Sequence, residues 1–423
     1  MPTASNLGVL PDNLSVPDLS RPATSSRTCR LCGAPLRQDL IDFGYMPLVT
    51  HSISVHASMP EPARRLRIRV CDACTLVQTD EPAPSPMLSG AELRRTASRH
   101  EHARRLAAAL IQKWRLGPDT RLVQVGSGDG AVLRHFRAAG IAAIGIDAVP
   151  DASPAVPTET AVFTAETAME IAVRHGRADM VVVDGVLPKV PDMFDFAAGL
   201  ANLLRPNGIV SITVPYVLPI LQHLQFDAFR HDVQAYLSLR VLERLLCAVG
   251  LRVFDAERLP ENGGVLRTHA CAGNARHAAR HGLKATRMAE TMAEADPAGL
   301  YDGFSARVAA ARAHIHDFIA VRRAAGRRIA AYGATTRGSM LLNVCGLDAN
   351  DVVWVADPQP APIGHILPGS SVPIAPLHKL QDDRPDDLLI LPWPDAHEIA
   401  ATLQSVRHRG VQFWTPLPRL ARV

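Results

Sequence analysis

The sequence lacks a long apolar run, a strong net charge and a signal-peptide pattern. None of the apolar runs in its 423 residues is long enough to cross a membrane. The net charge of +4 is too small for this length to indicate nucleic-acid binding. Residues 1–27 are rich in Ser, Pro, Thr and Asn, with no basic start and no continuous apolar stretch. We therefore expect a loose tail there and not a signal peptide, and no membrane or nucleic-acid partner.

Cysteine is scarce, but four of the seven cysteines form two identical pairs. Cys29 and Cys32 lie in TCRLCG, and Cys71 and Cys74 lie in RVCDAC. Four thiolates spaced as two C-x-x-C pairs match the tetrahedral coordination of a structural Zn²⁺ ion. One alternative is a redox pair, which is disfavoured because no βαβ pattern surrounds either pair; another is four unrelated buried thiols. A zinc site together with free thiols favours a cytoplasmic location.

The order of helix-like and strand-like segments predicts an α/β protein with several folded units. A hydrophobic content of 47% is enough to form sizeable cores. Strands that alternate with helices predict parallel sheets with crossover helices. They are expected at 121–126, 142–148, 178–187 and 207–216, and again at 327–334, 352–357, 386–393 and 411–416. The expected units are a tail at 1–27, a zinc-binding module at 28–85, an α/β domain at 86–275 and a second, Rossmann-like α/β domain at 276–423.

A glycine-rich turn follows the first expected strand of the larger domain. The segment VQVGSGDG places three glycines between a strand and a helix, where backbone N–H groups can face a ligand. A dinucleotide turn would read G-x-G-x-x-G, so the third glycine comes one residue too early for that class. A turn without a ligand is the other alternative. The candidate cofactor contacts in this turn are Gly126, Ser127, Gly128, Asp129 and Gly130.

Two further acids follow neighbouring strands of the same domain. Asp147 ends the second strand, where its carboxylate can accept hydrogen bonds from both hydroxyls of a ribose. Asp184 follows the third strand and is expected on the adenine side of the cofactor, with a capping role as the alternative. A G-x-G-x-G turn with an acid after the next strand resembles class I S-adenosylmethionine methyltransferases.

The order of the units resembles one family of these enzymes. A four-cysteine module, a methyltransferase domain and a second Rossmann-like domain resemble the nucleotide-sugar C-methyltransferases of deoxysugar biosynthesis. The resemblance implies S-adenosyl-L-methionine as cofactor, a structural Zn²⁺ ion and a nucleotide-linked sugar as the small-molecule acceptor. The motifs that carry it, from Cys29 onward, are FGYMPLVTH, ITVPY, ENGGVLRTHA, YGATTRG and LPGSSVPI.

The resemblance also implies a mechanism, from which this sequence departs. In the family a base removes the proton beside a 4-keto group, and the resulting carbanion attacks the sulfonium methyl group. The base comes from a histidine-glutamate-histidine segment that aligns with FDAFRHDVQAY. His231 keeps the first position, Asp232 replaces the glutamate, and Val233 replaces the expected base. The candidate catalytic residues are therefore His231, Asp232 and Tyr216, with His223 as a displaced base. Structural roles for His231 and Tyr216 are the alternatives.

Other family positions have changed as well. The segment SPMLSGAELRRTAS holds none of the family's tyrosines, and Pro362 stands where the family has a lysine that contacts phosphate. Arg337 replaces a second family lysine at the start of a helix. We expect Arg267, Arg337 and Asp357 to contact the substrate, with solvent-facing or capping roles as alternatives.

The favoured hypothesis is an S-adenosylmethionine-dependent methyltransferase of a sugar or secondary-metabolite pathway. Its acceptor is either changed, to an amine, a hydroxyl or a more acidic carbon, or deprotonated by a base placed elsewhere. One alternative is a cofactor-binding homologue that catalyses a non-methylating reaction or acts as a scaffold. Another is a dinucleotide-dependent enzyme that uses the YGATTRG turn. The oligomeric state is left open.

Overall fold

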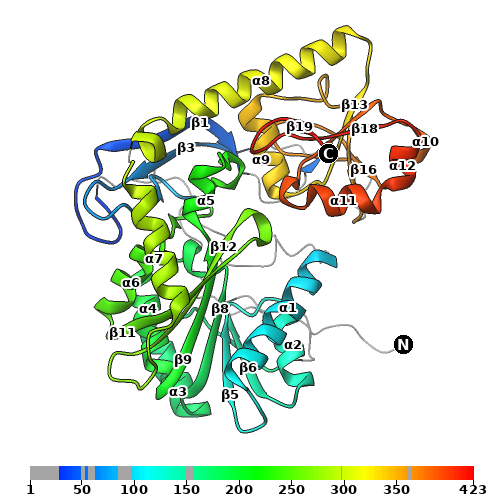
Figure 1. Ribbon diagram of the computed structural model, residues 1–423. Coiled ribbons are helices and arrows are strands. Elements are labelled where there is room, and N and C mark those ends of the chain that lie inside the picture. The colour runs from blue at the N-terminus through cyan, green and yellow to red at the C-terminus, as the bar shows by residue number, and fades with distance from the viewer. Residues whose placement is uncertain are drawn as a thin grey trace, which may run out of the picture.

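The computed structural model describes residues 28–48, 53–55, 62–83, 97–148, 156–296, 298–359 and 364–423. These residues form a small cysteine-containing module, a domain with a seven-stranded sheet and a smaller C-terminal α/β domain (Figure 1). The fold class expected from the sequence is confirmed. The expected tail, most of the tyrosine-free segment and Pro362 lie outside the described residues.

The cysteine-containing module is an antiparallel sheet that includes a strand from the middle domain. Strand β1 (Gln38–Pro47) pairs with β3 (Ala63–Val70), and β3 pairs with β4 (Val77–Thr79). The outer partner of β4 is β10 (Ala235–Tyr236), which comes from far along the chain. Strand pairing therefore fixes this module to the segment that contains His231.

The middle domain has a seven-stranded sheet in the order β11-β12-β9-β8-β5-β6-β7. Five strands are parallel, whereas β12 runs antiparallel to β9 and β11 runs antiparallel to β12. The sequence analysis did not predict this antiparallel hairpin at the edge. The chain changes direction across the sheet between β5 and β8, which is where open α/β sheets bind ligands. The strands are β5 (Arg121–Val125), β6 (Ala142–Asp147), β7 (Thr158–Thr160), β8 (Ala178–Asp184), β9 (Leu204–Pro215), β11 (Leu251–Leu259) and β12 (Val265–Ala272).

Helices cover both faces of this sheet because successive strand residues point to opposite faces. Helices α1 (Ala97–Trp114) and α2 (Ala131–Ala138) pack on one face, over a core that includes Leu122 and Phe254. Val123, the next residue after Leu122, belongs to the core of the other face. That face is covered by α3 (Ala165–His175), α4 (Met193–Leu203) and α6 (Leu239–Ala248), and α7 (His281–Glu294) packs along β11.

The C-terminal domain has a second sheet, in the order β16-β14-β13-β17-β18-β19. All four strands expected from the sequence are present, and β16 and the antiparallel β19 are additional. The strands are β13 (Ile329–Tyr332), β14 (Val355–Asp357), β16 (Ile374–Pro376), β17 (Asp387–Ile390), β18 (Gln412–Thr415) and β19 (Ala421–Arg422). The helices are α9 (Thr336–Cys345), α10 (Lys379–Asp382), α11 (Ala396–Thr402) and α12 (Gln404–His408).

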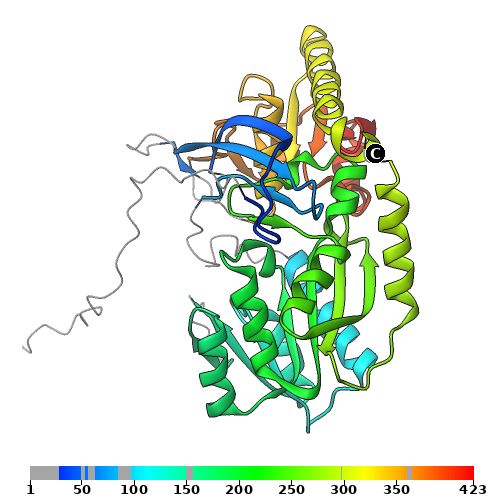
Figure 2. The same ribbon diagram turned by 90° about the vertical axis from the view of Figure 1, so that its left-hand side faces the viewer.

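One long helix joins two of the units. Helix α8 (Phe304–Ala324) contacts β1 of the cysteine-containing module and both β13 and α9 of the C-terminal domain (Figure 1). Strand β2 (Ile53–Ser54) also pairs with β15 (His365–Ile366). Figure 2 shows both smaller units on the same side of the seven-stranded domain. None of the helices in the described ranges is long and apolar enough to cross a membrane.

Candidate active site and metal centre

The two cysteine pairs come together in two matching turns. In each turn a backbone N–H beyond the pair donates to the carbonyl of the first cysteine: Gly33 to Cys29 at 2.9 Å, and Thr75 to Cys71 at 2.8 Å. Gly33 and Thr75 both have positive φ, which such a tight turn requires. The turns place Cys29 Sγ 3.4 Å from Cys74 Sγ.

The four thiols fit a tetrahedral metal site. All four sulfur atoms lie within 4.8 Å of one another, and three of the four cysteines are buried. The Cys74 thiol and the backbone N–H groups of Leu31 and Cys32 lower the pKa of Cys29 to about 4, whereas the hydrogen bond to Cys29 raises the pKa of Cys74 and burial raises that of Cys71. A thiolate at neutral pH is the form that binds Zn²⁺. These residues would hold the ion as a structural centre, because four protein ligands leave no open position for a substrate.

The glycine-rich turn adopts the geometry of a ligand-binding loop. Gly126, Gly128 and Gly130 all have φ between +53° and +75°, which is the left-handed region. A Cβ atom on Gly126 would lie 2.1 Å from Cγ2 of Val186, so the loop packs directly against the segment after β8. Asp147 accepts a hydrogen bond from the Gly128 N–H at 2.8 Å and is buried. The acid that the sequence predicted for a ribose therefore lies beside the glycines.

Asp129 and Ser127, the other two predicted loop residues, stabilise this turn through hydrogen bonds to neighbouring backbone groups. Asp129 accepts from the N–H of Ala131, the first residue of α2, at 3.0 Å. Ser127 is buried, and its N–H faces the Ile146 carbonyl at 3.3 Å. These contacts hold the backbone of the loop at the carboxyl ends of β5 and β6. The arrangement fits the nucleoside part of the expected cofactor.

Asp184 has a partner that the sequence analysis missed. Its Oδ2 atom lies 2.9 Å from Nε2 of His102 on α1, and His102 Nδ1 lies 3.0 Å from Oε2 of Glu261. Glu261 is in the short helix η4 (Glu261–Gly263) between β11 and β12. The hydrogen bond to Asp184, and after it the Glu261 carboxylate, raises the pKa of His102, although burial opposes this shift. A histidine one turn into an amphipathic helix gives no sequence signal that distinguishes it from a surface residue.

His231 lies between the cysteine-containing module and the middle domain. Its Nε2 donates to the backbone carbonyl of Arg64 in β3 at 3.0 Å, and its own carbonyl accepts from the Ala83 N–H. The Nε2 proton is thereby fixed, so Nδ1 carries the lone pair. Nδ1 has no hydrogen-bond partner among the residues that the structure describes. Burial lowers the pKa of His231, which favours the neutral ring at pH 7.

Asp232 is part of an ion cluster. Burial opposes its ionisation, but Arg230 and Lys189 more than offset this effect and lower its pKa. Arg230 donates to both carboxylate oxygens, at 2.9 and 2.7 Å, and Lys189 lies at 3.0 Å. Lys189 ends the short helix η2 (Leu187–Lys189) that follows Asp184 in the chain. Val233, where the family has its base, is buried beside this cluster.

Tyr216 and Asp357 occupy strand ends, as expected. Burial raises the pKa of the Tyr216 phenol, so it stays protonated at neutral pH. Asp357 accepts from the backbone N–H groups of Ala334 and Gln359, at 2.7 and 2.8 Å. Its carboxylate therefore closes the turn between β13 and α9.

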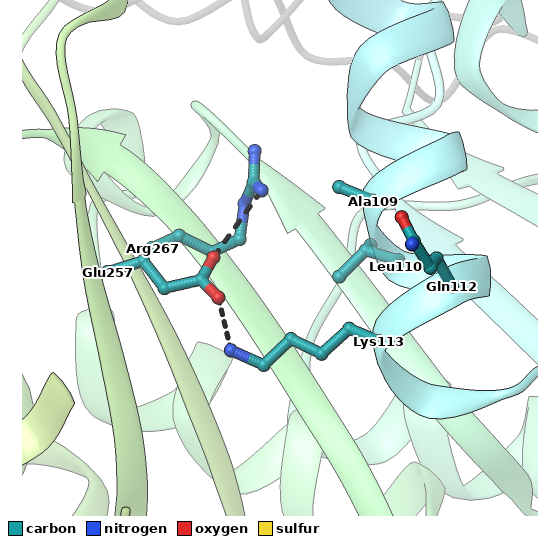
Figure 3. A pocket seen from close by; sticks show the side chains of 6 residues that line it. All are labelled: Ala109, Leu110, Gln112, Lys113, Glu257 and Arg267. Carbon is teal, nitrogen blue, oxygen red and sulfur yellow. Dashed lines mark hydrogen bonds and ion pairs between the residues drawn. The ribbon is translucent and has the colours of Figure 1, made fainter. Parts of the chain in front are cut away.

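Arg267 lies in a separate pocket of about 350 Å³ beside α1 (Figure 3). It is buried in β12, where Nε donates to Thr213 Oγ1 at 3.2 Å and Nη1 lies 3.6 Å from Glu257. Lys113 pairs with the same Glu257 carboxylate from the opposite side (Figure 3). The guanidinium is therefore paired within the protein. Its partners lie on the neighbouring strands and not in the turn formed by Gly263 and Gly264.

Arg337 crosses from the C-terminal domain to the middle domain. Its guanidinium forms a two-point ion pair with Asp227, at 2.8 and 2.9 Å, and Asp227 is fully buried. It also donates to the Asn262 carbonyl and to Gln225 Oε1. Trp393 donates its indole N–H to the same Asp227 carboxylate at 3.1 Å. Asp227 lies in η3 (Phe226–Ala228), just before the segment that contains His231.

Comparisons with known proteins agree with this arrangement. A family model described as a methyltransferase domain matches residues 99–256, a C-methyltransferase C-terminal domain matches residues 260–418, and a zinc binding domain matches residues 29–87. C-methyltransferase NovU of Streptomyces niveus is 32% identical over 416 residues, which cover 95% of this chain and 97% of that protein. The chain belongs to this C-methyltransferase family.

Two solved methyltransferases are similar at lower identity. One is the 1,6-didemethyltoxoflavin-N1-methyltransferase of Burkholderia thailandensis, at 19% identity and a TM-score of 0.35. The match covers 53% of this chain and 100% of that one. The other is the magnesium protoporphyrin IX methyltransferase of Synechocystis PCC 6803, at 14% identity and a TM-score of 0.30. The match covers 41% of this chain and 79% of that one.

Family membership settles the class of chemistry. This C-methyltransferase depends on S-adenosylmethionine, and its four-cysteine module is a zinc module. The loop from Gly126 to Gly130 with Asp147 fits the cofactor. The roles of the individual residues at the acceptor side stay predictions.

Proposed function

We propose that this enzyme methylates a carbon next to the ketone of a nucleotide-linked sugar, and that His231 is the base. The observation that carries the proposal is the state of the His231 ring. Its Nε2 proton is held by the Arg64 carbonyl, and burial keeps the ring neutral. Its Nδ1 atom is buried and has no partner among the described residues, and a neutral imidazole in this state is the form that accepts a proton.

The position of His231 supports the same role. It lies two residues before Val233, where the family has its base, so a short shift along the segment replaces one imidazole by another. The segment is held by β10 in the zinc module and by the Asp227–Arg337 pair to the C-terminal domain. All three units therefore fix the place of the base.

The roles divide among this chain's own residues. His231 removes the proton. Arg230 and Lys189 both pair with Asp232, the residue after His231, and the net positive charge of this cluster would stabilise the developing enolate oxygen. When bound, S-adenosylmethionine supplies the methyl group that the carbanion accepts. The zinc module forms the wall that carries Arg64 and therefore orients the imidazole. NovU, named as a C-methyltransferase, supports transfer to carbon.

Solvent exchange tests the base without requiring methyl transfer. A nucleotide-linked 4-keto sugar is incubated in D₂O with the enzyme and S-adenosylhomocysteine, and loss of the proton beside the ketone is followed by NMR. His231→Asn should slow this exchange by at least about a hundredfold, which is the usual contribution of a general base.

His223→Asn is the matched control because His223 is exposed and was the displaced base considered from the sequence. It should leave the exchange rate unchanged. If His223→Asn stops the exchange and His231→Asn does not, the proposed base is wrong.

The ion cluster favours a second acceptor class. Two cations around Asp232 suit an acceptor that is already an anion, such as the enolate of a 1,3-dicarbonyl carbon acid. Such an acceptor needs no protein base. Methylation of an acidic carbon at equal rates by wild type and His231→Asn, with no exchange at the keto sugar, would favour this class.

A further inference from the structure

The structure links three elements at the cofactor end of the sheet through one imidazole. His102 in α1 contacts Asp184 at the end of β8 and Glu261 in η4, at 2.9 and 3.0 Å. All three side chains are about one-fifth to one-quarter exposed. The partners are 82 and 159 residues away in the chain. The imidazole therefore joins segments that the chain itself does not connect.

The two contacts require a particular charge state. A carboxylate can only accept hydrogen bonds, so His102 must carry a proton on both ring nitrogens to donate to both partners. A neutral ring would direct a lone pair at one carboxylate. Asp184 first, and then Glu261, raises the pKa of His102 accordingly.

Among the described residues, charged groups on the neighbouring helices have partners of their own. On α1 itself, Arg105 forms an ion pair with Glu101 at 2.8 Å. On α2, which packs against α1, Arg134 lies 4.0 Å from Asp129. From β8 and η4 the groups that face the ring are Asp184 and Glu261. The protonation of His102 therefore depends mainly on these two acids.

Asp184 lies at the edge of the sheet where the cofactor is expected to bind. It ends β8, which borders the switch point opposite β5 and its glycine loop. Two residues later, Val186 packs so closely on Gly126 that a methyl group there would overlap it. A shift of the end of β8 would therefore move Val186, on which Gly126 packs, and with it the glycine loop.

Glu261 extends the link to the substrate side. The carbonyl of the next residue, Asn262, accepts a hydrogen bond from Arg337 of the C-terminal domain at 2.8 Å. Gln225 donates to the Gly263 carbonyl at 2.6 Å. The turn that His102 holds is thus also held by the other domain.

We propose that His102 is a positioning residue for the cofactor: as an imidazolium it joins Asp184 to Glu261 and holds the end of β8 under the glycine loop. It acts through Asp184 and does not itself take part in methyl transfer. Loss of its charge releases one of the two carboxylates and loosens the loop. Cofactor affinity then depends on the protonation of one histidine outside the glycine loop.

Calorimetric binding of S-adenosylhomocysteine between pH 6 and pH 9 tests the proposal. For the wild type, affinity should fall about tenfold as pH rises through the titration of His102, since one charge-assisted hydrogen bond is lost. His102→Gln should bind about tenfold more weakly at pH 6 and should not show this fall.

His175→Gln is the matched control. His175 on α3 also pairs with a carboxylate, Glu159, at 2.7 Å, but it lies on the surface away from the loop. It should keep the wild-type affinity and pH profile, and it corrects for titration of the ligand's own amine. Wild-type binding by His102→Gln at every pH, or an equal loss in His175→Gln, would overturn the proposal.

A second variant separates positioning from a purely structural role. Glu261→Gln keeps the size of the side chain and the Asp184 contact but removes one carboxylate. The His102 signal, in protein labelled at the histidine rings, should then titrate at lower pH than in the wild type. The fall in affinity should move to lower pH with it. An unchanged midpoint in either measurement would contradict the proposed link.

Discussion

The buried ion pair between Arg337 and Asp227 should control how the C-terminal domain docks. Arg337→Met keeps the apolar stem. Among the described residues it leaves the Asp227 carboxylate, which has no exposed surface, with the Trp393 indole as its one remaining donor. It also removes the donors to Gln225 and Asn262. Removing one partner of a buried pair costs about 3–5 kcal/mol, because the remaining charge is uncompensated.

The assay is thermal unfolding followed by tryptophan fluorescence. Three of the four tryptophans, Trp354, Trp393 and Trp414, lie in the C-terminal domain. For a domain of this size the loss corresponds to a fall of roughly 10 °C in its transition. The control is Arg328→Met, which breaks an exposed ion pair with Asp383 in the same domain and should cost less than about 1 kcal/mol.

The double variant Asp227→Asn with Arg337→Met decides the physical cause. If the uncompensated charge is responsible, removing it should recover at least half of the lost stability. If the double variant is no more stable, the cost comes from the packing of Arg337 over the Trp393 ring, at 5.4 Å. A fall for Arg337→Met no larger than for Arg328→Met would refute the reasoning altogether.

Three further outcomes follow from the same structure. Cys32→Ser should lose the zinc ion in metal analysis and unfold the N-terminal module, whereas Cys247→Ser, at an exposed thiol, should keep one zinc per chain. Gly126→Ala should weaken S-adenosylhomocysteine binding more than tenfold in calorimetry, because its φ is +75° and Val186 blocks a Cβ; Gly117→Ala, with open space around it, should not. Burial lowers the pKa of His231, so the unfolded chain binds that proton first and stability falls as pH drops below about 6.5. Urea unfolding at pH 5.5 and 7.5 should show a smaller difference for His231→Gln than for the wild type or for exposed His223→Gln.

The features that the sequence predicted well are those encoded over a few residues. A C-x-x-C pair forms its turn from the cysteines and the one or two residues after them, so its spacing alone identifies the zinc centre. The glycine loop is similar, because three positive φ values within five residues leave few choices of residue. Asp147 followed from the loop, since neighbouring parallel strands end at the same edge.

The missed features depend on partners that are distant in sequence. His102 meets Asp184 only when α1 folds across the end of β8, and Arg337 meets Asp227 across 110 residues. No local spacing relates such residues. The edge hairpin of β11 and β12 was missed because no α-helix separates these two strands, so the alternation of strands and helices that predicted the other strands does not extend to them.

The segment that contains His231, the proposed base, is held by all three units. The zinc module gives the carbonyl that fixes the tautomer of His231, and the middle domain supplies Lys189 and Asp232. The C-terminal domain holds Asp227, four residues before His231, through Arg337. A valine at the expected base position therefore removes one group from a frame whose other supports are intact. In the proposed mechanism, such a frame presents a neighbouring imidazole to the acceptor, because the segment is held at both ends.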